Sequence, residues 1–180
     1  WGNNSWGQAN PPRGVAFKAL SLGGRHTCGL KPDGTVACWG DNRSGQASPP
    51  GGTYLALSAG FVHTCAIRTD TTVVCWGDNT YRQVVAVGGP GWDAVSAGLF
   101  HTCARYFGVW YCWGWNASVY PAEAGNQAPV LDSLAPGGDH TCGLRPDGTA
   151  RCYGSNTFGQ SAPPGGTFTS LVSGSIHTCG

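Results

Sequence analysis

The sequence is poor in charge and contains no methionine. Charged residues make up 11% of its 180 residues, against roughly 25% in an average globular chain. Phosphate binding needs clustered Lys and Arg, so this scarcity and the formal net charge of +1 argue against nucleic acid as a partner. A basic protein of the membrane surface is excluded on the same ground. The sequence also lacks an apolar run of about 18 residues, so we expect no membrane insertion within this segment.

Glycine, tryptophan and cysteine are abundant instead. The 30 Gly indicate many turns, whereas the 8 Trp and 9 Cys exclude a disordered, low-complexity chain. The chain therefore folds, and its turns have to be frequent.

Internal repeats are the strongest signal in the sequence. The tripeptide His-Thr-Cys occurs five times and contains every histidine, with steps of 37, 38, 39 and 37 residues between its cysteines. Nine or ten residues after each of the first four such cysteines comes Cys-Trp-Gly, or Cys-Tyr-Gly in the fourth unit. We expect one domain that continues into a longer array, because Cys179 has no partner position within the chain. Its units are residues 1–12 (partial), 13–50, 51–88, 89–127, 128–164 and 165–180 (partial).

Each unit has room for three or four short strands. In the first complete unit, residues 17–22, 26–30 and 35–39 are typical of strands, and residues 46–48 fit a weak fourth strand. Lys31-Pro32-Asp33-Gly34 has the chemistry of a tight turn, and no helical period is present. The sequence therefore predicts an all-β propeller with about five repeats, each a blade of four short antiparallel strands. A β-solenoid is the alternative, although its repeats are usually shorter.

The cysteine spacing supports hairpins. Cys28 and Cys38 lie symmetrically about Asp33, and residues symmetric about a hairpin turn face each other closely enough for a disulfide. Zinc is the competing interpretation, but it prefers Cys-x2–4-Cys pairs that this sequence lacks, so we expect no metal and no cofactor. Disulfides indicate an oxidising compartment, so the protein is expected to be secreted or at the cell surface. The predicted bridges are Cys28–Cys38, Cys65–Cys75, Cys103–Cys112 and Cys142–Cys152, with Cys179 unpaired in this chain.

The motif shared by the units resembles the repeats of the regulator-of-chromosome-condensation superfamily. It reads aromatic-x2-Leu-x2-Gly-x2-His-Thr-Cys-x-Leu-x2-Asp-Gly-x3-Cys-Trp-Gly-x-Asn and extends over the whole chain. It is similar to the secreted, cysteine-paired branch found in bacterial surface proteins and Crinkly-type receptor ectodomains. The resemblance implies propeller blades of four strands. The nuclear founder of the family acts on a small GTPase and chromatin, and the cysteines and low charge argue against carrying that activity over.

No catalytic group of residues emerges from the sequence. One histidine per unit predicts a buried imidazole that bonds to neighbouring backbone, rather than a metal ligand or a catalytic base. Trp39, Trp76 and Trp113 alternate with the cystine face and are expected between blades, although aromatic faces also stack on sugars.

The third unit departs from the pattern and carries extra aromatic residues. Its predicted binding patch consists of Tyr106, Phe107, Trp110 and Trp115. Three Asn-x-Ser sequons make Asn3, Asn42 and Asn116 candidate sites of N-glycosylation in a eukaryotic secretory pathway.

These features favour a non-catalytic extracellular interaction or scaffold module that belongs to a cell-surface or extracellular assembly. Its expected partners are other proteins or further copies of itself. A lectin-like propeller that binds glycans is one alternative, and a secreted enzyme or enzyme inhibitor is another. The fold alone does not decide between them.

Overall fold

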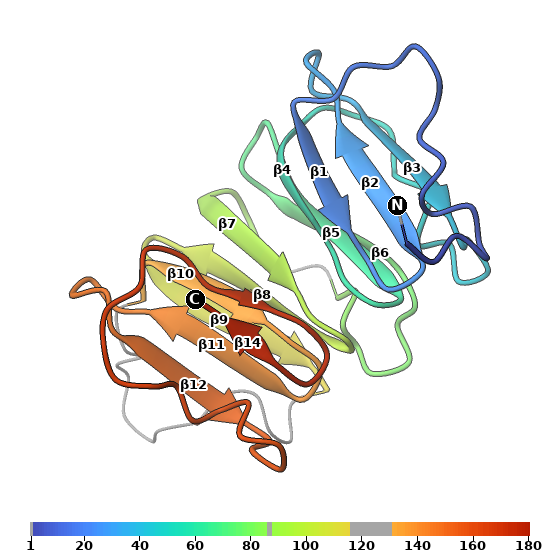
Figure 1. Ribbon diagram of the computed structural model, residues 1–180. Helices are drawn as coiled ribbons and strands as arrows, with labels where there is room; N and C mark the ends of the chain where they lie inside the picture. The colour runs from blue at the N-terminus through green and yellow to red at the C-terminus, as the bar shows by residue number, and fades with distance from the viewer. Residues whose placement is uncertain (1, 86–87, 116–130) are drawn as a thin grey trace.

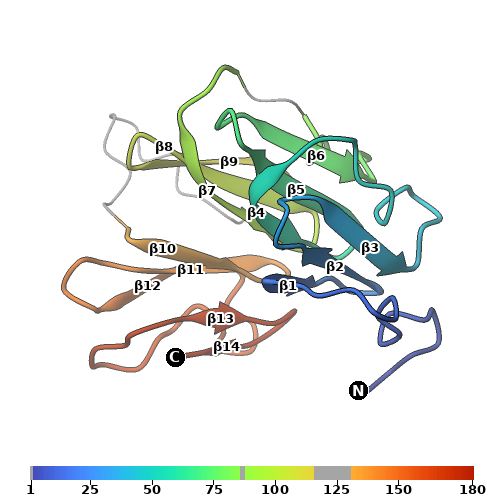
Figure 2. The same ribbon diagram turned by 90° about the horizontal axis from the view of Figure 1, so that it is seen from above.

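The chain folds into short β-strands and turns in the computed structural model, which describes residues 2–85, 88–115 and 131–180. No helix occurs in these ranges, and hence none that could cross a membrane. The strands form five antiparallel sheets, which follow one another in chain order around an arc (Figures 1 and 2). The arc is not a closed ring in this part of the chain, but the all-β, propeller-like architecture agrees with the sequence prediction.

Four of the sheets have three strands in sequential order, and the last has two. Each sheet falls within one of the repeat units. The strands are β1 (Ala19–Leu22), β2 (His26–Leu30), β3 (Val36–Gly40), β4 (Tyr54–Ala59), β5 (His63–Arg68), β6 (Val73–Gly77), β7 (Trp92–Ala97), β8 (His101–Tyr106), β9 (Val109–Gly114), β10 (Ser133–Pro136), β11 (His140–Leu144), β12 (Ala150–Gly154), β13 (Val172–Ser173) and β14 (Thr178–Cys179).

The fourth strand predicted for each blade is wrong for the described residues, whose sheets have at most three strands. After β3 the chain makes two consecutive turns, closed by hydrogen bonds from Gly45 N–H to the Asn42 carbonyl (3.0 Å) and from Ser48 N–H to the Gly45 carbonyl (3.1 Å). The Asn42 side-chain oxygen accepts the N–H of Ala47 (2.9 Å). Local bonds thus occupy the backbone groups that a fourth strand would offer for pairing.

The hairpin turns follow their predicted chemistry. Asp33 Oδ1 accepts the N–H of Thr35 (2.9 Å), and Gly34 has a φ of +83°, a region that glycine enters without steric cost. In the third unit Tyr106 pairs with Val109, which leaves the expected two-residue turn at residues 107–108. Both turn residues have positive φ, 46° and 80°, as a turn compatible with strand twist requires.

The hydrophobic core lies between neighbouring sheets rather than within one unit. Cys28 and Leu30 of β2 pack with Tyr54, Ala66 and Trp76 of the second sheet. The same arrangement recurs between the second and third sheets, and between the third sheet and Leu131. A unit of this size therefore buries its apolar residues only against its neighbour, as in other repeat architectures.

Candidate functional site

Four disulfides join the second and third strands of the three-stranded sheets. The two cysteines of each pair stand directly opposite each other in the ladder, with Cα atoms 4.0–4.1 Å apart. The first cysteine of each pair is fully buried, so the bridges face the core. Cys179 is exposed and is the free cysteine of the described residues. The bonded pairs are the four that the spacing predicts: Cys28–Cys38, Cys65–Cys75, Cys103–Cys112 and Cys142–Cys152.

Each buried histidine bonds to the following unit. His26 Nε2 lies 2.7 Å from the Thr64 hydroxyl, and His63 Nε2 lies 2.9 Å from the Thr102 hydroxyl. His101 and His140 repeat the contact, with Thr141 (3.1 Å) and Thr178 (2.8 Å). The prediction of a buried imidazole is confirmed for four of the five histidines, whereas His177 is exposed. The predicted backbone partner is wrong, because the imidazole bonds to a side-chain hydroxyl of the next blade.

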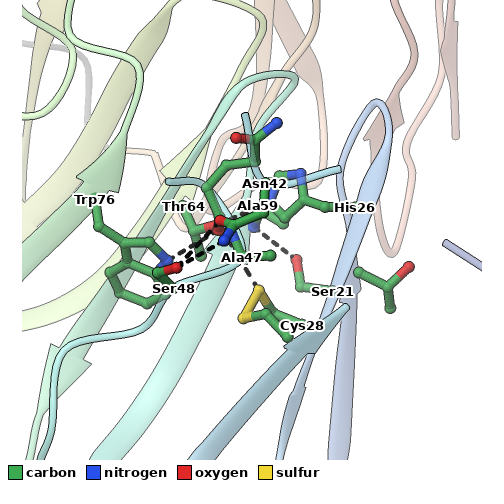
Figure 3. The surroundings of a disulfide bond; sticks show 12 residues. Ser21, His26, Cys28, Asn42, Ala47, Ser48, Ala59, Thr64 and Trp76 are labelled. Carbon is green, nitrogen blue, oxygen red and sulfur yellow. Dashed lines mark hydrogen bonds between the residues drawn. A yellow bond between two sulfur atoms is a disulfide. The ribbon is translucent and has the colours of Figure 1, made fainter. Parts of the chain in front are cut away.

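The threonine hydroxyl connects this histidine to a backbone carbonyl. Thr64 donates to the carbonyl of Gln46 (3.0 Å), so its oxygen has to accept the proton carried by His26 Nε2. The Trp76 indole N–H donates to the same carbonyl (2.9 Å). Figure 3 shows His26 and Cys28 of one unit beside Thr64 and Trp76 of the next. We call this set of histidine, threonine, glutamine carbonyl and tryptophan the inter-unit lock.

A glycine lies against each imidazole of the lock. A Cβ built on Gly60 would lie 2.7 Å from Cε1 of His63, and closer still to the carbonyl oxygen of Gly98. Gly23, Gly98 and Gly137 stand in the same position toward the histidines of their own units. No larger residue fits without moving the imidazole, which explains the glycine three residues before each histidine.

The lock keeps its histidines neutral. Burial lowers the pKa of His26 and of His101 to about 4, and that of His63 to about 3. Burial also lowers the pKa of His140. The Nδ1 atoms of His26, His63 and His140 are buried without a hydrogen-bond partner. Within the described ranges, no three His, Cys, Asp or Glu residues gather as metal ligands would. The lock is therefore a structural device.

The repeated tryptophans belong to this lock. Trp76 is buried, as predicted, whereas Trp39 and Trp113 are half-buried. The indole N–H groups of Trp39 and Trp113 donate to the carbonyls of Gln8 (2.9 Å) and Gln83 (3.0 Å). These indole bonds hold each ring at the boundary between two units.

The structure divides the predicted binding patch between two ends of one hairpin. Trp110 is buried (5% exposed) and donates its N–H to the Leu131 carbonyl, so it belongs to the core. Phe107 is 75% exposed at the turn, next to Tyr106. Trp115 lies beyond the opposite end of the hairpin, where its backbone N–H donates to the Phe100 carbonyl. Because β8 and β9 run the full length of the sheet, these aromatics do not form one surface.

Two of the three sequons are within the described residues, and Asn116 lies outside them. Asn3 and Asn42 are exposed, but both side chains close their own loops. Asn42 also donates its amide to Ser48 (2.8 Å). The asparagine at this position thus has a structural role whether or not it carries a glycan.

The repeat motif does not include the glutamine of the lock. Gln8, Gln46, Gln83 and Gln160 each follow an asparagine by four residues, which is a detectable signal. Their side chains accept a backbone N–H within the loop, for example Ser44 N–H to Gln46 (2.9 Å), while the carbonyls of Gln8, Gln46 and Gln83 accept the indole N–H of the next unit. A backbone acceptor leaves no chemical signature in a sequence, so its role emerges only from the structure.

The family model of the regulator of chromosome condensation (RCC1) repeat matches residues 17–46, 55–83 and 133–160 of the chain. The unmatched third unit is the one that departs from the shared motif.

Solved structures with similar folds include propellers of receptor ectodomains and of a yeast protein. The chain is 29% identical to the ectodomain of the Physcomitrella patens receptor kinase CR4, with a TM-score of 0.82, and covers 52% of that protein. It is 28% identical to the CRINKLY WD40 ectodomain of the Arabidopsis thaliana receptor kinase ACR4, with a TM-score of 0.73. The two comparisons cover 100% and 95% of this chain, which spans 62% of the ACR4 structure. The Saccharomyces cerevisiae protein Prp20p, 16% identical with a TM-score of 0.71, shares the fold over 94% of this chain and 56% of its own.

Proposed function

Since this chain belongs to the superfamily of RCC1-like repeats, we propose that it is a non-catalytic interaction module of an extracellular or cell-surface assembly. Its partners in this proposal are proteins, including further copies of the chain. The solved structures that it resembles at 28–29% identity are receptor ectodomains. The yeast protein Prp20p, similar in fold alone, binds Gsp1p and histones.

The main observation behind the proposal is that most cysteine and histidine side chains have structural partners. Eight cysteines are oxidised in pairs, and four of the five histidines are bonded into the next unit. The described residues leave aromatic side chains accessible, among them Phe107 and Phe158, and aromatic residues are enriched in protein interfaces. We therefore favour binding over catalysis.

The oxidised cysteines support an extracellular or cell-surface location for the chain. Four bridges within one small chain point to an oxidising environment, because cytosolic thiols are kept reduced. We propose that the chain works outside the cytoplasm. We also propose that its repeat units, with the bounds given under Sequence analysis, belong to a longer array of such units.

Proximity labelling tests this function in the natural source. A peroxidase fused to the full protein is expected to label a small set of extracellular or surface proteins above the level of the secreted peroxidase alone. Labelling of cytoplasmic proteins, or no enrichment over that control, would contradict the proposal. Binding to a glycan array without protein enrichment would favour the lectin alternative instead.

A further inference from the structure

One face of the arc carries a continuous group of aromatic rings, some exposed and some half-buried. This loop face contains the loops before β2, β5, β8 and β11 and the residues that directly follow β3, β6 and β9, at the opposite end from the hairpin turns (Figure 1). Tyr81 and Trp115 stack on it with ring centroids 5.4 Å apart and an angle of 18°. Phe100 contacts both, at 5.1 and 5.7 Å, and Phe61 lies 6.4 Å from Phe100. Two neighbouring units thus contribute to one aromatic surface.

Two arginines extend this surface toward the N-terminus. The guanidinium carbon of Arg25 lies 5.8 Å from the ring centroid of Phe61 and 5.5 Å from that of Trp6. Arg43 stacks on Trp6 at 4.0 Å. Both distances to Trp6 are within the range of a cation–π contact. We call Trp6, Arg25, Arg43, Phe61, Tyr81, Phe100 and Trp115 the aromatic–arginine stripe.

The fold does not require the exposed rings of the stripe. Trp6, Tyr81 and Phe158 occupy the same loop position, and they are 40%, 42% and 71% exposed. In each case the backbone N–H bonds to the glutamine two residues later, and Ser44 makes the identical bond in its unit. Since serine closes the loop as well, an aromatic side chain at the other positions has a different purpose. Exposed aromatics next to arginine are typical of binding hot spots.

The two carboxylates in the loops of the stripe, those of Asp41 and Asp78, both accept hydrogen bonds from their own loops. The carboxylate of Asp41 is buried and held by Arg43 through two hydrogen bonds, of 2.9 and 2.8 Å. Asp78 is occupied by Thr80 (3.0 Å) and by Gln83 (2.8 Å). Arg25 is exposed and pairs with no carboxylate among the described residues. Its stacked guanidinium therefore keeps N–H donors free for an incoming anion.

A hollow beside the stripe provides an anchor site. It has a volume of about 320 Å³ and lies where the loops before the second strands of all five sheets converge. Phe61 belongs both to the stripe and to the wall of this hollow, together with Leu22, Leu99 and Pro136. Glycine backbone forms much of the remaining wall, which leaves room for one large apolar side chain.

We propose that the aromatic–arginine stripe is the docking surface for an extended acidic peptide segment of a protein partner. Carboxylates of the segment bind Arg25 and the outer edge of Arg43, and an aromatic or proline side chain enters the hollow beside Phe61. The free guanidinium argues for a peptide over a neutral glycan, because stacking on a sugar needs the rings but not the positive charge. The inference rests on the proposed function and specifies its surface.

The test is selection of random phage-displayed peptides on the immobilised chain, followed by binding titrations with the enriched peptides as synthetic probes. Four variants are compared, three of which copy residues from equivalent positions of other units and should keep the fold. Tyr81→Ser copies Ser44, Trp115→Ser copies Ser155, and Arg25→Val copies Val62. Phe107→Asn is the control on the opposite face, since asparagine tolerates the positive φ of that residue. Circular dichroism verifies the fold of each variant.

We expect acidic peptides with aromatic or proline residues to be enriched. Tyr81→Ser and Trp115→Ser should each weaken binding about tenfold, as for hot-spot residues, and Arg25→Val should in addition reduce the dependence on salt. Phe107→Asn should bind as the parent chain does. If the enriched peptides bind all variants equally, the stripe is not the docking surface, although the proposed interaction function still holds. If no peptide is enriched, or if the variants lose glycan binding instead, the peptide proposal is wrong. Proximity labelling decides separately whether the protein binds proteins at all.

Discussion

Acid should destabilise this protein through its buried histidines, beginning well above the pKa of about 4 that is ordinary for carboxylates. The perturbation is a shift from about pH 7.5 to about pH 5. The buried imidazoles of His26, His63 and His101 have pKa values near 4, 3 and 4, because burial disfavours their charged form. In the unfolded chain an imidazole has a pKa of about 6.5. The unfolded state therefore binds more protons between these values, and the free energy of unfolding falls as the pH decreases from about 6.5 toward 4.

The magnitude follows from the linkage between proton binding and stability. Each histidine contributes about 1.4 kcal/mol per pH unit within its window. Over the proposed shift this is about 2 kcal/mol per imidazole, and on the order of 6 kcal/mol for the three together. The pKa of Asp41 is lowered to about 2, chiefly by its hydrogen bonds with Arg43, so its stabilising effect is lost only below about pH 4. The two effects are thus separated on the pH axis.

Urea denaturation followed by tryptophan fluorescence, at several pH values and with the disulfides oxidised, measures this effect. The His63→Gln variant keeps an N–H for Thr102 but removes one titrating group, so the loss of stability over this shift should be smaller by about 2 kcal/mol. His177→Gln, at an exposed histidine, is the matched control and should behave as the parent chain does. Stability that stays constant from pH 7.5 to pH 5, or an unchanged slope in His63→Gln, would refute the account of the lock.

Substitutions at Trp76, Gly60 and Asn42 test the lock and its loops in the same urea assay. Trp76→Phe should lower the free energy of unfolding by about 1–3 kcal/mol, because the Gln46 carbonyl loses a donor while most packing remains; no loss would mean that this bond is dispensable. Gly60→Ala should lower the free energy of unfolding by about 3 kcal/mol, because the added methyl group meets the His63 imidazole. Gly51→Ala is its control and should change this free energy little, because a methyl group there enters open space. Asn42→Asp should remain stable, because it keeps the acceptor for Ala47 N–H, while Asn42→Ala should cost about 1 kcal/mol; equal stabilities of the two variants would contradict the role of this side chain.

The repeat pattern predicts the strands of each hairpin and the disulfides, because both depend on local spacing. Cys28 and Cys38 are paired by the length of the turn between them, which the residues themselves display. The position of Trp110 in the core was not predictable in this way. It depends on Leu131, which lies in the next unit and accepts the indole bond through its backbone. Contacts of this kind are set by how units stack, and no periodicity within one unit reports them.

The fourth strand fails for a similar reason. Residues 46–48 have the composition of a short strand, but the side chains of Asn42 and Gln46 close two turns around them. The competing local hydrogen bonds of asparagine and glutamine outweigh weak strand propensity. The aromatic–arginine stripe could not be predicted from the sequence either, because Trp6, Phe61 and Trp115 come together from distant positions in the chain.

The most direct test of the central claim, that this is a disulfide-stabilised repeat module of an oxidising compartment, is peptide mapping without reduction of the protein from its natural source. The account predicts bridges within units only: Cys28–Cys38, Cys65–Cys75, Cys103–Cys112 and Cys142–Cys152. Free thiols at these eight positions, or bridges that join one unit to another, would contradict it.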